Sequence, residues 1–341
     1  KPKTMNNSYI KETNYGISIL RVLLAFMVVI DHFYNKEVKK KFKHLLYFHI
    51  PTFFLLSFYF TYNSFCTFNI SKIKARFERL LIPYISWNII AFILNNIYFY
   101  YFKKICPHSY KDFFRGLLGG KIFIVALWFQ NVLIFSTLVV SIVVFSFKEI
   151  YVLIFHFLMI ISYISQYSEF NYYFFTRKFS INYSTTFGRF LDTFPHSLTG
   201  FFLGAFKIPN KLKYNKFRAI IISLIVILLL SKYKFDKKIL SFKYAGIRLN
   251  LASISLFLIF FLSLEKVTSK KMKKFLNIIT NYTAGIYFIH WKLGTGYIMK
   301  IILGNKINTL FGSSIVYLIS YSLCFCLDKL IGNSKFKHMI K

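Results

Sequence analysis

The sequence predicts an all-α membrane protein, a bundle of about ten transmembrane helices. Hydrophobic residues make up 56% of the 341 residues, only 16% are charged, and uncharged apolar runs recur along the whole chain. A soluble domain has about 25% charged residues. A run of about 20 apolar residues is long enough to cross a hydrocarbon layer of roughly 30 Å, so membrane spans account for this composition.

Ten apolar runs are separated by short and mostly basic connections. Strands of a β-barrel would show alternating segments of about ten residues, whereas these runs are longer and continuously apolar, so we expect helices. The predicted spans are residues 16–34, 44–62, 80–102, 121–147, 149–165, 187–206, 217–233, 246–264, 278–302 and 309–331. No internal repeat or low-complexity linker divides them, so we expect one membrane-embedded domain over residues 1–341.

The first run has the basic flanks of a signal peptide, but no small-residue cleavage site follows it. We therefore expect a retained first helix. Basic residues are spread too evenly over alternate connections to fix the orientation of the chain.

The net charge is +34, from 45 basic and 11 acidic residues. Lysines gather between apolar runs, as in residues 36–43 and 266–274, where they suit anionic lipid headgroups better than nucleic acid. We expect membrane lipid, and no nucleic acid, as a partner. The four cysteines, Cys66, Cys106, Cys324 and Cys326, have neither zinc nor disulfide spacing and are expected to be packing residues, so no metal site is predicted.

The first span contains Arg21, Asp31 and His32. Ionisable residues in a span cost roughly 2.5–3.5 kcal/mol each on insertion scales and are candidates for function. Eleven residues turn a helix about 20° past three full turns, so Arg21 and His32 share one face about 16 Å apart, and Asp31 lies about 100° away. Arg21 could hold phosphates bidentately, and His32 could act as a general base on a hydroxyl. The alternative is that Arg21 snorkels to one interface and His32 ends the span at the other.

A basic loop is predicted after the second span, over residues 72–84. Arg76 and Arg79 lie three apart, so on a helix they form one cationic surface. If the N-terminus is inside, this loop faces the same side as Arg21, and the three arginines could form a phosphate site. An ordinary basic juxtamembrane loop is the alternative.

Two later spans also contain ionisable residues. In the sixth, Arg189, Asp192 and His196 lie on one helical face, and Pro195 would kink the helix. They are either an internal ion pair with a neighbouring histidine or substrate-binding residues. In the ninth, His290 is either an interfacial anchor or a substrate-binding residue.

Five segments, taken in order, resemble acyltransferase family 3, bacterial membrane acyltransferases that include O-antigen and other polysaccharide O-acetylases. Residues 17–32 resemble its opening pattern of arginine, ten residues and histidine. Residues 49–57 (HIPTFFLLS) resemble its second element, although Phe58 stands where the family usually has glycine. Residues 76–84 resemble its second arginine motif, and residues 127–129 (LWF) and 286–290 (IYFIH) its later landmarks.

This resemblance implies a membrane-bound O-acyltransferase. The donor would be acyl-CoA, usually acetyl-CoA, used as a co-substrate, with no permanently bound cofactor. The acceptor would be a hydroxyl of a cell-envelope or exported glycan or glycolipid, and the location the inner (cytoplasmic) membrane, with multiple spans. By analogy, Arg21, Arg76 and Arg79 bind CoA, and His32 is catalytic. The alternative function is a transporter or exporter of a glycan or glycan precursor, which is disfavoured because no repeat or broken helix is visible.

Overall fold

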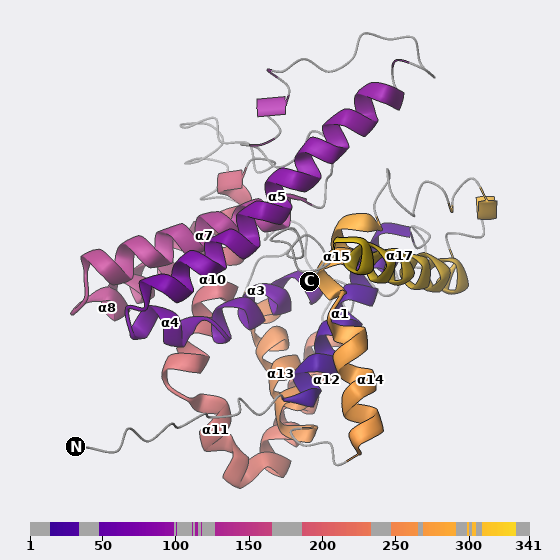
Figure 1. Cartoon of the computed structure of the whole chain (residues 1–341). Helices are drawn as coiled ribbons and strands as arrows, with labels where there is room; N and C mark the ends of the chain where they lie inside the picture. The colour runs from indigo at the N-terminus through magenta and orange to yellow at the C-terminus, as the bar shows by residue number, and fades with distance from the viewer. Residues whose placement is uncertain are drawn as a thin grey trace, which may run out of the picture.

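The protein is described by a computed structural model, in which all the elements are helices (Figure 1). It describes residues 14–33, 48–98, 100, 111, 113–114, 117, 127–165, 186–232, 247–264, 269–290, 299, 302–304 and 309–331, and these contain no strand. Cys106, the lysine cluster at residues 36–43 and the ends of several predicted spans lie outside these ranges.

Four described helices are long and apolar enough to cross a membrane: α1 (Tyr15–Phe33), α5 (Ile70–Tyr98), α7 (Leu127–Ser146) and α17 (Leu310–Ile331). The other helices are α3 (His49–Tyr59), α4 (Tyr62–Cys66), α8 (Tyr151–Ser165), α10 (Thr186–Ala205), α11 (Ile208–Leu212), η3 (Lys213–Asn215), α12 (Lys216–Lys232), α13 (Ile247–Ser263), α14 (Lys270–Thr280) and α15 (Thr283–Ile289). The all-helical membrane fold is confirmed, and the count of ten spans is not.

Two predicted boundaries were wrong. The predicted loop at residues 72–84 is helical, because α5 begins at Ile70 and continues into the apolar run. Its lysines, arginines and Glu78 are good helix formers that an apolar-run criterion overlooks. The predicted ninth span, residues 278–302, is not one helix, because a turn at Asn281 and Tyr282 separates the lysine-rich α14 from the apolar α15.

Polar side chains define where several helices begin. In each case a backbone N–H in the first helical turn has no carbonyl partner within the helix. A side-chain oxygen three residues earlier accepts a hydrogen bond from it instead. These bonds run from Ile17 N to Asn14, from Lys72 N to Asn69, from Met272 N to Ser269 and from Gly312 N to Thr309, at 3.0–3.4 Å.

Helix α1 packs at the centre of the fold, against α3, α13, α14, α15 and α17 (Figure 1). Its first half buries Leu20 and Leu24 against α3 and α13. Its second half turns Val28 toward α5, α7 and α15, and Val29 toward α15 and α17. Both ionisable ends of α1 are therefore held by neighbouring helices.

Helices α3 and α10 approach each other closely at Gly200. A Cβ atom at this position would overlap the backbone carbonyl of Leu55 in α3. Phe54 and Phe58 of α3 are fully buried against Phe194 and Leu198 of α10. Small residues permit such backbone contact between membrane helices, where apolar burial against lipid gives little driving force.

The outer helices present apolar side chains outward. Leu153, Phe157 and Ile160 on α8 and Ile222 and Leu228 on α12 are all more than half exposed. Exposed apolar surface of this extent suits hydrocarbon rather than water. These faces of α8 and α12 are therefore suited to contact with lipid.

We predict that Gly200→Val destabilises the protein by about 1–3 kcal/mol or more, because the added side chain has only backbone to displace. Thermal unfolding of the purified protein in detergent measures this effect. Ile222→Phe is the matched control, since it adds bulk on the exposed face of α12. Equal melting temperatures for Gly200→Val and wild type would contradict the close approach.

Candidate functional site

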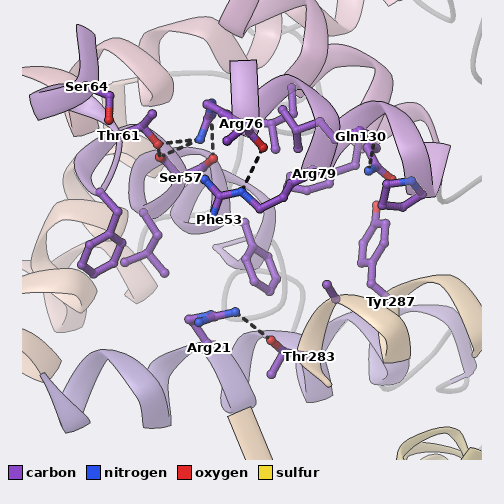
Figure 2. Close-up of a pocket in the computed structure, with 18 of the residues that line it drawn as sticks. Arg21, Phe53, Ser57, Thr61, Ser64, Arg76, Arg79, Gln130, Thr283 and Tyr287 are labelled. Carbon is purple, nitrogen blue, oxygen red and sulfur yellow. Dashed lines mark hydrogen bonds between the residues drawn. The ribbon is translucent and has the colours of Figure 1, made fainter. Parts of the chain in front are cut away.

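A cavity of about 610 Å³ lies between α1, α3, α4, α5, α7 and α15 (Figure 2). Segments far apart in the sequence therefore form its wall. The lining residues are Arg21, Phe53, Leu56, Ser57, Phe60, Thr61, Asn63, Ser64, Lys72, Ala75, Arg76, Arg79, Leu80, Pro83, Phe129, Gln130, Leu133, Thr283, Ala284, Tyr287 and Phe288.

Helical periodicity explains which residues of each helix face the cavity. On α5 the cavity-lining positions are Lys72, Ala75, Arg76, Arg79, Leu80 and Pro83. These steps of three and four residues follow one face of a helix with 3.6 residues per turn. Because the arginine-rich stretch is helical, Arg76 and Arg79 face the same space, as their spacing predicts.

Arg76 is the most constrained of the three arginines. Its side chain is only 7% exposed, and its guanidinium donates to the Oγ1 atoms of Thr137 (3.1 Å) and Thr61 (2.6 Å). It also donates to the hydroxyl of Ser57 (2.9 Å) and to the carbonyl of Ser57 (3.2 Å). Among the described residues these hydrogen-bond partners are all neutral, so none of them cancels the positive charge with a negative one.

Phe58, at the position where the family that the sequence resembles usually has glycine, lies against this arginine. The Cζ atom of Arg76 is 4.9 Å from the centre of the Phe58 ring, which is the arrangement of a cation–π contact. The phenyl ring thus fills the space that a glycine would leave to a neighbouring helix. Ser57, to which the sequence assigned no role, orients Arg76 with both its hydroxyl and its carbonyl.

Arg21 and Arg79 are less tightly held by hydrogen bonds than Arg76 is. Arg21 is half-buried, and its Nη2 donates to Thr283 Oγ1 at 3.2 Å. Arg79 is exposed, and its Nε donates to the Ala75 carbonyl at 3.2 Å. Arg21 lies across the cavity from Arg76 and Arg79, with Phe53 between them (Figure 2). An anion in the cavity would therefore meet guanidinium groups from two sides.

Gln130 adds a hydrogen-bond acceptor to the wall. Its Nε2 donates to the Leu80 carbonyl at 2.6 Å, and the acceptor is the other atom of the same amide group, Oε1. Oε1 is buried and has no hydrogen-bond partner among the described residues. A ligand N–H or O–H in the cavity would satisfy this atom.

The structure brings His32 to His290. Their ring centroids are 5.1 Å apart with an interplanar angle of 33°. Helix α15 packs along α1, so that Thr283 meets Arg21 near one end and His290 meets His32 near the other. The sequence placed these histidines in separate roles, and only the packing of α15 on α1 shows that they are neighbours.

Aromatic rings connect the cavity to this histidine pair. Tyr287 lines the cavity, and its ring centroid lies 6.0 Å from that of His290 and 5.2 Å from that of Phe129. Phe129 in turn contacts Phe53 at 6.0 Å. The site therefore has a cationic end at α5 and the start of α1, and an aromatic side that leads to the two histidines.

The predicted cluster on α10 lies apart from the cavity lining. The Cζ atom of Arg189 lies 4.1 Å from the centre of the Trp128 ring, and Asp192 and His196 are buried. His196 Nδ1 is 3.3 Å from Asn250 Oδ1, and the Asn250 amide donates to Thr199 at 2.7 Å and also to the hydroxyl of Tyr163. The substrate-binding role of Arg189, Asp192, His196 and His290 stays a prediction.

Sequence reasoning missed Ser57, Thr61 and Thr137 as partners of Arg76. Ser57 and Thr61 lie four apart, so their place on one helical face was readable from the sequence. Thr137 was not, because its hydroxyl also donates to the Leu133 carbonyl one turn earlier, the ordinary bond of a threonine within a helix. Its contact depends on how α5 packs against α7.

Comparison with known proteins identifies the family. The family model described as "Acyltransferase domain" matches residues 14–329, nearly the whole chain. No curated protein and no solved structure gives a match. The match includes α1, α3, α4, α5, α7 and α15, the helices that form the cavity. The chain therefore belongs to acyltransferase family 3 and is a membrane acyltransferase.

Proposed function

We propose that this enzyme transfers an acetyl or other short acyl group from acyl-CoA to a hydroxyl of a cell-envelope or exported glycan, at the inner membrane. The observation that carries the proposal is the cavity with Arg21, Arg76 and Arg79 in its wall. A buried guanidinium with neutral partners is costly, and an anionic ligand offsets this cost. The phosphates of CoA suit the planar guanidinium groups.

The remaining cavity wall suits the rest of the donor. The Gln130 Oε1 atom is an acceptor for an amide N–H, and the pantetheine arm of CoA contains amide groups. Phe53, Phe129 and Tyr287 offer apolar surface along the way to His32. In this arrangement the phosphates lie at the arginines, and the thioester points toward the histidine pair.

The proposed reaction is a direct acyl transfer. His32 accepts the proton of the acceptor hydroxyl while the hydroxyl oxygen attacks the thioester carbonyl carbon. The new C–O bond forms, the C–S bond breaks, and the CoA thiolate receives the proton from His32. The products are the glycan ester and free CoA. A residue that takes and returns a proton near neutral pH needs a pKa in that range, and the ordinary pKa of histidine is about 6.5.

The proposal is tested with cells that contain or lack the protein. Mass analysis of their surface glycans is expected to show an added acyl group only when the protein is present. The mass of that group distinguishes acetyl from a longer chain. Identical glycans in both strains would contradict the proposed acceptor class.

We predict that His32→Ala reduces acyl transfer by about 10²–10⁴-fold, because the general base is lost. Expression, membrane insertion and CoA binding should be retained. The assay follows transfer of a radiolabelled acetyl group to membranes that contain the acceptor. A normal transfer rate for this variant would overturn the catalytic role.

We predict that Arg21→Lys raises the Michaelis constant for acetyl-CoA about tenfold, because the charge stays but the bidentate fork is lost. Initial rates at varied donor concentration give this constant. Arg218→Lys is the matched control, since Arg218 is an exposed arginine on α12 outside the cavity lining. An unchanged donor constant in Arg21→Lys would exclude Arg21 from CoA binding.

We predict that Gln130→Leu raises the same constant by roughly three- to tenfold, the effect of one neutral hydrogen bond. The rate at saturating donor should change little. Thermal unfolding of the variant checks that loss of the bond to the Leu80 carbonyl has not disturbed the fold. If donor affinity equals that of wild type, the Oε1 atom does not bind the donor.

A further inference from the structure

The tautomer of His290 is fixed by its own helix. Its Nδ1 lies 2.8 Å from the carbonyl oxygen of Ile286, one turn earlier. A carbonyl oxygen only accepts, so Nδ1 carries the proton and donates it. In the neutral ring the other nitrogen, Nε2, therefore presents a lone pair and can only accept a hydrogen bond.

This lone pair is buried and unused among the described residues. The His290 side chain has no exposed surface, and Nε2 has no hydrogen-bond partner in the described part of the chain. Burying an acceptor without a donor costs free energy, and a phenylalanine at this position would avoid that cost. An unsatisfied atom of this kind indicates a donor that arrives or reorients during function.

The neighbouring rings narrow the identity of that donor. Phe33, at a centroid distance of 6.5 Å, has no N–H or O–H group, and Tyr287 at 6.0 Å belongs to the cavity wall. His32 is closer, at 5.1 Å, and carries a ring N–H. This separation leaves room for one N–H···N hydrogen bond of about 2.9 Å between facing ring nitrogens after a small rotation of His32.

We propose that His290 is the positioning residue of His32, an inference that rests on the proposed function. Nε2 of His290 accepts the N–H of His32, so that the second nitrogen of His32 is unprotonated and faces the acceptor hydroxyl. When His32 takes the hydroxyl proton, its new positive charge is shared along this hydrogen bond. The arrangement follows the general rule that a catalytic base is oriented by a third group, here a neutral imidazole in place of a carboxylate.

The test compares two substitutions of His290 in the full-length enzyme. His290→Phe keeps the ring shape but removes the acceptor, and should lower kcat for acetyl transfer by roughly 10–100-fold with an unchanged CoA dissociation constant. His290→Gln can place an amide oxygen near the position of Nε2 and should recover part of that loss. His156→Phe is the matched control, because His156 makes the same bond to the carbonyl four residues earlier (Val152) but is exposed on α8.

A second measurement is independent of turnover. In protein labelled with histidine that carries ¹⁵N at Nε2 alone, the resonance that disappears in His290→Gln is that of Nε2 of His290 in wild type. That resonance should be of the unprotonated type and should shift when His32 is replaced by phenylalanine. The positioning role would be refuted if Nε2 carries the proton, or if its resonance does not shift in the His32→Phe variant.

The outcomes separate this inference from the proposed function. If wild type transfers no acyl group, the proposed function fails, and the ¹⁵N measurement still decides the contact between the two histidines. If wild type is active and His290→Phe matches its kcat, the inference alone fails. Equal losses of CoA binding and thermal stability in the Phe and Gln variants would assign His290 a structural role instead.

Discussion

The buried guanidinium of Arg76 is the constraint on which the arrangement of the site depends. Inside a membrane protein a charge must be solvated by the protein itself. Ser57 near the end of α3, Thr61 in the turn that follows it, and Thr137 on α7 provide the four hydrogen bonds that do so. Because these acceptors come from separate helices, solvating Arg76 fixes α3, α5 and α7 around the cavity.

The same requirement explains why the cavity is cationic at one end. Arg76 cannot leave its acceptors without desolvated polar groups remaining behind. Arg79, one turn later on α5, is free of that network and exposed, and Arg21 reaches the cavity from α1. One arginine thus holds the helices together, while two others have donors left for a ligand. Helix α15, packed along α1, then brings Thr283 to Arg21 and His290 to His32.

Phe58 stands where the family usually has glycine, and the contacts of α3 accommodate its larger side chain. Glycine at this position would permit close helix approach. Here the ring lies against the Arg76 guanidinium, and close approach occurs elsewhere, where Gly200 of α10 meets the backbone of α3. The packing of α3 therefore depends on a cation–π contact on one side and on a glycine of its neighbour on the other.

The sequence by itself determined the helical membrane class, the family and the shared face of Arg21 and His32, because apolar run length and helical period are local properties. It also indicated that Arg76 and Arg79 form one cationic surface, although it placed them in a loop rather than in α5. Only the tertiary structure decided that Thr137 solvates Arg76 and that His290 faces His32, since these contacts join segments 61 and more than 250 residues apart. Such contacts depend on how helices pack against one another, which no periodicity along a single helix specifies.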